Sequence, residues 1–218
     1  MCAKRSLWLV HQSENGSSNE ASPPTLRFLL VGLRRSFVTV TDRVKLYRFI
    51  AMNGDLSLLE TVRFVVFDFD GVFTDNRVLV GQDGSEYVFC CRSDGLGLEA
   101  LVRAGIPALV LSTEVNPIVL ARTSKLKLEC IHGCSDKWPE LERLMAARGY
   151  EPSDVAYVGN DVNDRECLSH VGVPICVADA HPDVRPLAKL ITRRRGGRGA
   201  VREICDVIIR AKNGGWRA

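Results

Sequence analysis

The sequence has no apolar run close to the ~20 residues that a membrane-spanning helix needs. Its net charge is only +3 over 218 residues, which gives no reason to expect a nucleic-acid partner. The apolar stretch at residues 7–10 runs directly into polar residues and is too short for the core of a secretory signal. We therefore expect a cytoplasmic protein that has neither a membrane nor a nucleic acid as its partner.

The sequence also lacks the regular cysteine spacing of a disulfide framework, although it contains eight cysteines. Several of them lie in apolar, strand-like runs, which favours reduced thiols. Cys130 and Cys134, with His132 between them, have no second ligand pair at the spacing of a zinc site. The cysteines therefore predict neither disulfides nor zinc.

Composition divides the chain into an extension, a domain and a short tail. Hydrophobic residues make up 46% and charged residues 25%, which is typical of a globular domain. Residues 12–24 have the Ser, Asn, Glu and Pro content of a disordered linker. Residues 26–52 could be an amphipathic basic segment or an ill-ordered extension. They could also result from a start codon that was placed too far upstream. We expect the extension over residues 1–60, the domain over 61–213 and the tail over 214–218.

Short apolar runs alternate with helical patterns along the domain. Buried strands are predicted at residues 62–67, 106–111, 128–131, 155–158, 173–177 and 190–192. Helices are predicted at residues 93–104, 117–126, 136–147, 164–170 and 200–212, with one more after Pro182. Strands that alternate with helices predict an α/β domain with a doubly wound parallel sheet.

A β-hairpin is predicted directly after the first strand, over residues 77–89. Alternating apolar residues flank Gln82-Asp83-Gly84, and Asp-Gly between such runs is a strong hairpin signal. We expect Val78 and Val80 to face Tyr87 and Phe89 across this turn.

The first predicted strand ends at two acids, Asp68 and Asp70, followed by Gly71. Acids at the end of an apolar strand are costly to bury, and two of them one residue apart suit a shared Mg²⁺ ion. Alone, the pattern fits a solvated turn equally well. Ser112 and Asp161, however, also follow predicted strands, and ligands of such sheets bind beyond the carboxyl ends of the strands. We therefore expect these side chains to converge on one site.

These residue types suit phosphoryl transfer. Asp68 can attack phosphorus and form an acyl-phosphate, and Asp70 can act as general acid and base. Asp161, together with Asp68 and the Asp70 carbonyl, would complete the Mg²⁺ site. Ser112 offers a hydroxyl group and Lys137 a positive charge to the phosphoryl oxygens.

The chain resembles the haloacid dehalogenase (HAD) superfamily over about residues 62–212. The four motifs of that superfamily match, in order, Asp68 to Thr74, Leu109 to Ser112, Lys137, and Gly159 to Asp164. The resemblance implies a HAD-like doubly wound sheet. Only 41 residues separate Asp70 from Ser112, and the hairpin and one helix use them, so no cap domain is expected. The interval from Ser112 to Asp161 leaves no room for one either.

Further segments are similar to the phosphatases of eight- and nine-carbon 2-keto-3-deoxy sugar acids, which act on 3-deoxy-D-manno-octulosonate 8-phosphate and on KDN or sialate 9-phosphate. The segments are the hairpin, Arg92–Gly97, Val177–Pro182 and Gly196–Glu203. The resemblance implies Mg²⁺-dependent hydrolysis through an aspartyl-phosphate, in a pathway for lipopolysaccharide or surface polysaccharide. It also implies a homotetramer in which the hairpin acts as a flap over a neighbouring site.

Four residues become candidates for contact with the sugar acid. Arg92 and Arg198 suit a carboxylate, although solvated loop arginines explain them equally well. Glu114 stands in Ser112-Thr113-Glu114, where many octulosonate enzymes have Thr-Gly-Arg. Together with Lys125, Glu114 resembles the nine-carbon branch, whereas residues 196–203 resemble the octulosonate branch. Glu114 and Lys125 could also be an ordinary pair of surface residues. The sequence therefore does not decide between the eight-carbon and the nine-carbon sugar acid.

Other functions are weighed against this phosphatase. A catalytically idle oligomerisation or regulatory domain, akin to the tails of some acylneuraminate cytidylyltransferases, would have no chemical need for Asp68, Asp70, Lys137 and Asp161 together. A capless protein phosphatase has a similar first motif but would need an open peptide groove. Asp164 is expected either to support the metal through water or to cap the following helix.

Overall fold

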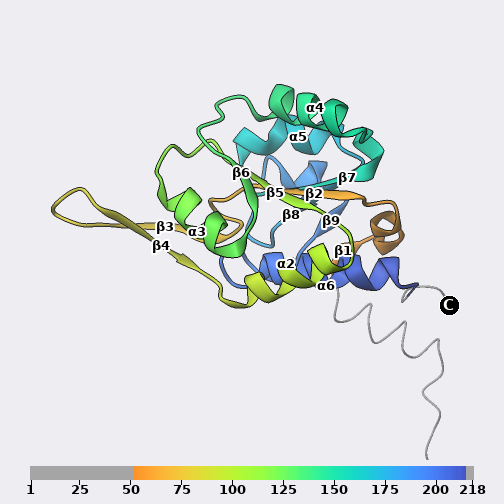
Figure 1. Cartoon of the computed structure of the whole chain (residues 1–218), viewed down its shortest axis with the longest axis horizontal. Helices are drawn as coiled ribbons and strands as arrows, with labels where there is room; N and C mark the ends of the chain where they lie inside the picture. Colours follow the sequence, from red (N-terminus) through yellow and green to blue (C-terminus); the bar gives the residue numbers. More distant parts are fainter. Residues whose placement is uncertain (1–51, 215–218) are drawn as a thin grey trace, which may run out of the picture. The chain divides into compact units, whose positions relative to one another are not determined.

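The computed structural model describes residues 52–214 (Figure 1), which form a seven-stranded sheet with helices on both faces. Neighbouring strands are, in order, β1 (Asn53–Gly54), β9 (Leu190–Ile191), β8 (Val173–Cys176), β7 (Val155–Gly159), β2 (Phe64–Phe67), β5 (Ala108–Leu111) and β6 (Glu129–Ile131). All pairings are parallel except that of β1 with β9. The predicted α/β fold with a parallel sheet is confirmed.

Two helical layers cover the sheet (Figure 1). One layer contains α2 (Ser93–Arg103) and α6 (Ala200–Lys212), and the other contains α4 (Lys137–Arg148) and α5 (Arg165–His170). The helix α3 (Ile118–Leu126) contacts β6 and the hairpin. Short 3₁₀ turns lie at Leu56–Glu60 (η1), Pro152–Asp154 (η2), Val162–Asp164 (η3) and Arg185–Leu187 (η4). The last of these replaces the helix expected after Pro182.

The central strands carry the core. All four residues of β2 are fully buried, as are those of the adjacent β7. Strands covered on both faces need apolar side chains on both, which explains the continuous apolar run before Asp68. Each such side chain contributes about 1.5–3 kcal/mol when buried. This rigid centre holds the loops that follow the strands.

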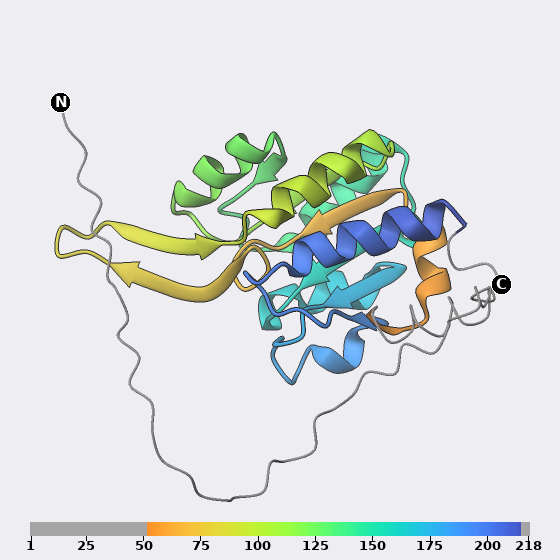
Figure 2. The same cartoon turned by 90° about the horizontal axis from the view of Figure 1, so that it is seen from below.

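The hairpin of β3 (Thr74–Val80) and β4 (Glu86–Cys90) extends away from the sheet (Figure 2). Its register pairs Val78 with Val88 and Val80 with Glu86. Directly paired residues share one face of an antiparallel pair, so Tyr87 lies on the opposite face from Val78 and Val80. The predicted facing of these valines with Tyr87 and Phe89 is therefore wrong. The turn itself is at Gln82-Asp83-Gly84, as expected, and the Gly81 N–H closes it by donating to the Ser85 carbonyl at 2.7 Å.

The segment before the expected domain start at residue 61 joins the domain. Strand β1 pairs with β9 through Asn53 and Ile191, η1 contacts α6, and Lys212 Nζ donates to the Glu60 carbonyl at 2.7 Å. We therefore propose that the domain begins at or before Met52. The rest of the expected extension, residues 1–51, and most of the expected tail, residues 215–218, lie outside the described residues. No helix within 52–214 is long and apolar enough to cross a membrane.

Candidate active site

The loops after β2, β5 and β7 enclose a cavity of about 300 Å³ at the carboxyl end of the sheet. Its lining consists of acids, amides and a hydroxyl group with one valine: Asp68, Asp70, Asn76, Thr113, Asn160, Asp161, Val162 and Asn163. The structure thus brings Asp68, Asp70 and Asp161 together from two separate strand ends. This is the position at which ligands of doubly wound sheets bind.

Asp68 is almost completely buried, with 3% of its surface exposed. Its Oδ1 accepts the Phe69 N–H at 2.7 Å and lies 2.8 Å from Lys137 Nζ. Burial raises the pKa of Asp68 to about 7, and the charge of Asp164 adds to the rise, while Lys137 acts against it. Asp68 is therefore a desolvated carboxylate whose charge depends on the cation beside it.

Lys137, the first residue of α4, lies between two buried carboxylates. Its Nζ is 2.8 Å from Asp68 Oδ1 and 2.7 Å from Asp164 Oδ1. Burial acts to lower the pKa of Lys137, but Asp68 and Asp164 together raise it above its ordinary value. The ammonium group is thus held charged between Asp164 and Asp68, the second of which lines the cavity.

Asp164 organises the loop after β7. It accepts hydrogen bonds from the Tyr157 hydroxyl at 2.7 Å and from the backbone N–H groups of Asn160 and Asp161 at 2.8 and 3.2 Å. The side chain makes no cap to the α5 helix that follows. Asp164 therefore fixes both Lys137 and the loop that carries Asp161, a role that the sequence did not indicate.

Asp70 is partly buried at the cavity wall. Thr74 Oγ1 lies 3.3 Å from Asp70 Oδ1 and also accepts the Gly71 N–H at 3.0 Å. Burial raises the pKa of Asp70, and the nearby charge of Glu114 raises it further. A raised pKa suits a carboxyl group that gives and takes a proton near neutral pH.

The donor set fits a hard cation when backbone and amide oxygens are included. No three Asp, Glu, His or Cys side chains within residues 52–214 form a metal-binding group by themselves. The Asn160 amide lies beside Asp68 and Asp70, where its nitrogen can donate to Asp68 Oδ2 at 3.1 Å and to the Asp70 carbonyl at 2.8 Å. With the amide turned over, the Asn160 oxygen lies at these same distances from the two other oxygens, so the three hard ligands are close enough together to share one cation.

Asn160 is the residue that sequence reasoning missed. Asp161 was the expected metal ligand of this loop, and its Oδ1 accepts the Val162 N–H at 2.7 Å. Ser112 is buried, and its hydroxyl accepts the Glu114 N–H at 3.1 Å. Its neighbour Thr113 is the residue of this segment that lines the cavity.

A groove of about 290 Å³ continues from the cavity between the hairpin and the start of α3. Asp70, Asn76 and Thr113 line both spaces. The rest of the groove combines apolar side chains with acids and an amide: Val78, Glu86, Val88, Glu114, Asn116 and Ile118. Asn116 Nδ2 donates to Glu86 Oε2 at 2.8 Å, which links the hairpin to the loop before α3.

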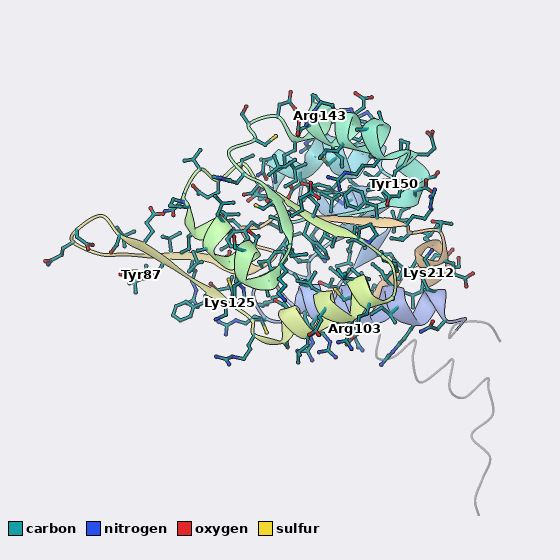
Figure 3. All side chains as sticks on the ribbon, viewed as in Figure 1. Tyr87, Arg103, Lys125, Arg143, Tyr150 and Lys212 are labelled. Carbon is teal, nitrogen blue, oxygen red and sulfur yellow. The ribbon has the colours of Figure 1, made fainter. Side chains whose placement is uncertain are left out.

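The four candidate substrate contacts are dispersed. Glu114 lines the groove, whereas Lys125 is exposed near the far end of α3 (Figure 3). Arg92 is exposed just before α2. Arg198 Nη2 lies 3.2 Å from Asp75 Oδ2 and lines a different cavity beside Arg77 and Phe89. Of the four, the structure brings only Glu114 to the groove.

Comparison with known proteins agrees with this site. Residues 110–204 match the model of the haloacid dehalogenase-like hydrolases. A 3-deoxy-D-manno-octulosonate 8-phosphate phosphatase from Yersinia pestis is 35% identical over 153 residues, which is 70% of this chain and 82% of that protein. A HAD family hydrolase from Streptomyces avermitilis is 48% identical, with a TM-score of 0.68 over 69% of this chain and 87% of its own.

A third relative contains ligands. The octulosonate 8-phosphate phosphatase from Moraxella catarrhalis was solved with a magnesium ion, a phosphate ion and KDO. It is 31% identical, with a TM-score of 0.70 over 73% of this chain and 92% of its own. The magnesium ion of this relative agrees with the cofactor predicted from the sequence.

The fold and the buried acids at its carboxyl edge define a haloacid dehalogenase-like hydrolase, an enzyme class that acts here on phosphoric monoesters. Within that class, the chain belongs to the family of the 3-deoxy-D-manno-octulosonate 8-phosphate phosphatases. The resemblance drawn from the four motifs is confirmed.

Proposed function

We propose that this enzyme uses Mg²⁺ to hydrolyse the phosphate ester of a 2-keto-3-deoxy sugar acid. The substrate is 3-deoxy-D-manno-octulosonate 8-phosphate or the nine-carbon KDN or sialate 9-phosphate. The observation that carries the proposal is the cavity that unites Asp68, Asp70 and the 159–164 loop above the buried Lys137. The named activity of the Yersinia pestis relative supports the substrate class.

In the proposed mechanism, Asp68 attacks phosphorus and Asp70 gives its proton to the leaving sugar oxygen. This forms an aspartyl-phosphate and the free sugar acid. Asp70 then takes a proton from water, which attacks the phosphorus and regenerates Asp68 with release of phosphate. Asp68 suits the first step because its carboxylate is desolvated, and Asp70 suits the proton transfers because burial raises its pKa.

We propose that Asp68, the Asp70 carbonyl and the 159–164 loop hold the magnesium ion. The loop ligand is Asn160, by its contacts, or Asp161, as its sequence position suggests. When bound, the ion supplies positive charge that offsets the repulsion between carboxylate and phosphate. Lys137 adds a fixed charge from below, and Ser112 is the proposed hydroxyl donor to the phosphoryl oxygens.

The groove beside Asp70 is the proposed place of the sugar. Its acids and amides suit hydroxyl groups, which can donate to Glu86 or Glu114 and accept from Asn116. Because Glu114 resembles the nine-carbon branch, the nine-carbon sugar acid remains an alternative substrate to the eight-carbon one. Arg92, Lys125 and Arg198 lie outside the lining of the groove and cavity, so we propose them as contacts with a carboxylate only in the assembled oligomer.

We also propose a homotetramer in which the hairpin covers a neighbouring subunit. The large apolar side chains of the hairpin are exposed on both of its faces, with exposed fractions from 52% at Val78 to 66% at Phe89. A two-stranded hairpin is marginally stable alone, and exposed apolar surface of this kind marks interaction sites. Light scattering should give four times the chain mass of 24.1 kDa. A mass of one chain would contradict the assembly.

The substrate is tested by phosphate release from octulosonate 8-phosphate and KDN 9-phosphate, assayed in parallel with Mg²⁺. A clear preference for one of them, abolished by a chelator, is the expected result and identifies the sugar. Release from neither, by a folded tetramer, would contradict the proposed function and favour an idle regulatory domain.

A further inference from the structure

Asn76 has a left-handed backbone conformation, which asparagine adopts more readily than most other non-glycine residues. Among residues 52–214, Asn76 (φ 63°) and Lys127 (φ 55°) are the non-glycine residues with a left-handed φ. Lys127 follows the last turn of α3, where this conformation commonly ends a helix. Asn76 lies instead inside the strand β3. Glycine adopts such a φ without steric cost, and asparagine is among the other residues that adopt it most readily, so the backbone alone does not decide between the two.

An irregularity of the hairpin places Asn76 at the site. Thr74 pairs with Cys90 and Val78 with Val88, so three residues of β3 lie opposite the single residue Phe89. Bulges of this kind redirect side chains and occur beside active sites. The Asn76 N–H donates to Thr74 Oγ1 at 3.3 Å, and this hydroxyl group also lies 3.3 Å from Asp70 Oδ1. The backbone of Asn76 is therefore tied to the loop that carries Asp70.

Asn76 lines both the cavity of Asp68 and the groove proposed for the sugar. It shares this position with Asp70 and Thr113, at the junction where a phosphate ester would cross from one space to the other. Within the described part of the chain, the amide of Asn76 makes no hydrogen bond of its own, and the residue is exposed at this junction, so its donor and its acceptor are both available to a ligand.

The charge of the surroundings favours a neutral amide here. Asp70, Glu86 and Glu114 line the groove together, so three carboxylates share this side of it. A fourth acid would add repulsion, and a cation would pair with these acids rather than remain open to a ligand. An amide offers a donor and an acceptor without either effect.

We propose that Asn76 is a substrate-binding residue whose amide bonds the hydroxyl group of the leaving alcohol adjacent to the ester oxygen. The contact orients the scissile bond toward Asp70 and selects polyol phosphates over simple esters. This inference rests on the proposed function, because it assigns a residue of the same site to a part of the substrate.

The test is Asn76→Gly, since glycine keeps the left-handed backbone and removes only the amide. The melting temperature should stay the same or rise. For the sugar acid phosphate, kcat/KM should fall about three- to tenfold, as for one lost hydrogen bond, mainly through KM. For p-nitrophenyl phosphate, which has no hydroxyl group beside its ester oxygen, the fall in kcat/KM should be clearly smaller. Lys127→Gly is the matched control and should leave both substrates unaffected.

Each other outcome overturns the inference. Unchanged kcat/KM for the sugar acid phosphate in Asn76→Gly would make Asn76 a turn residue alone. An equal loss on both substrates would mean that the substitution acts through the loop of Asp70. If the wild-type enzyme hydrolyses p-nitrophenyl phosphate but no sugar acid phosphate, the proposed function fails together with this inference. Normal wild-type turnover with an unaffected variant would contradict only the inference.

Discussion

Lys137 Nζ lies 2.8 Å from Asp68 Oδ1, and both side chains are almost completely removed from solvent. A second buried acid, Asp164, lies 2.7 Å from the same ammonium group. Removal of one member of such a group leaves an uncompensated charge in a medium of low dielectric constant. The proposed nucleophile therefore depends on Lys137 for its charge as well as its position.

Lys137→Met should lower the free energy of unfolding by about 3–5 kcal/mol, because Asp68 and Asp164 would lose their shared cation. Urea unfolding at pH 7 measures the change. Lys189→Met, which alters an exposed lysine, is the control and should change stability by less than about 1 kcal/mol. Equal effects of the two substitutions would contradict the assigned role of the buried ammonium group.

The sequence predicted the strands and helices well where their apolar patterns were continuous. The last helix has the predicted bounds, Ala200–Lys212, and Asp68 and Asp70 stand directly after β2 as expected. The contacts of Lys137 with two carboxylates could not be predicted, because they join residues 69 and 27 positions apart in the chain. Such pairings depend on how α4 packs beside the loops after β2 and β7.

The errors have similar physical causes. The facing of Val78 was wrong because the residues that close the turn, Gly81 and Ser85, set the register, and this register pairs Val78 with Val88 and not with Tyr87 or Phe89. Asn160 was missed because an asparagine between Gly159 and Asp161 gives no sign of which side chain turns inward. Backbone hydrogen bonds to Asp164 decide that orientation.

Asn160 and Asp161 make different predictions for Mg²⁺ binding. If the amide of Asn160 is the loop ligand, Asn160→Ala should weaken Mg²⁺ binding at least about tenfold, equivalent to 1.4 kcal/mol, and Asp161→Ala should have a smaller effect. Titration calorimetry with Mg²⁺ alone measures both affinities. The reverse order would assign the ligand to Asp161, and normal affinity in both variants would contradict a magnesium site at this loop.

Gly196 supports the loop after Asp70 by close backbone contact. A Cβ atom at this position would lie 1.7 Å from the Gly71 carbonyl oxygen, so Gly196→Ala must displace one of the two backbones. We expect at least about a tenfold loss of kcat, since small displacements of reacting groups have large effects. Gly95→Ala is the control, because its nearest neighbour is the end of the flexible Leu126 side chain. Normal turnover of Gly196→Ala would contradict this support.

Asp94 should make stability depend on pH. Burial raises its pKa to about 6, although the Arg202 N–H and the charges of Arg122 and Arg194 oppose the rise. The folded state then holds this proton more tightly than the unfolded state, whose Asp pKa is 3.8. The stabilisation from protonated Asp94 is complete below about pH 4 and is lost as the pH rises through 6.

Comparison with Asp94→Asn isolates this group. Relative to that variant, wild-type stability should fall by about 1–3 kcal/mol between pH 4 and pH 6 and then remain level. Urea unfolding across this range measures the difference. Parallel curves for the two proteins would show that Asp94 has an ordinary pKa in the folded state.

The most direct test of the account is Mg²⁺-dependent phosphate release by the wild-type enzyme and by Asp68→Asn. We expect turnover of a sugar acid phosphate by the wild type, loss of at least about four orders of magnitude in kcat in the variant, and unchanged secondary structure by circular dichroism. Full activity of a folded Asp68→Asn variant would contradict covalent catalysis by Asp68.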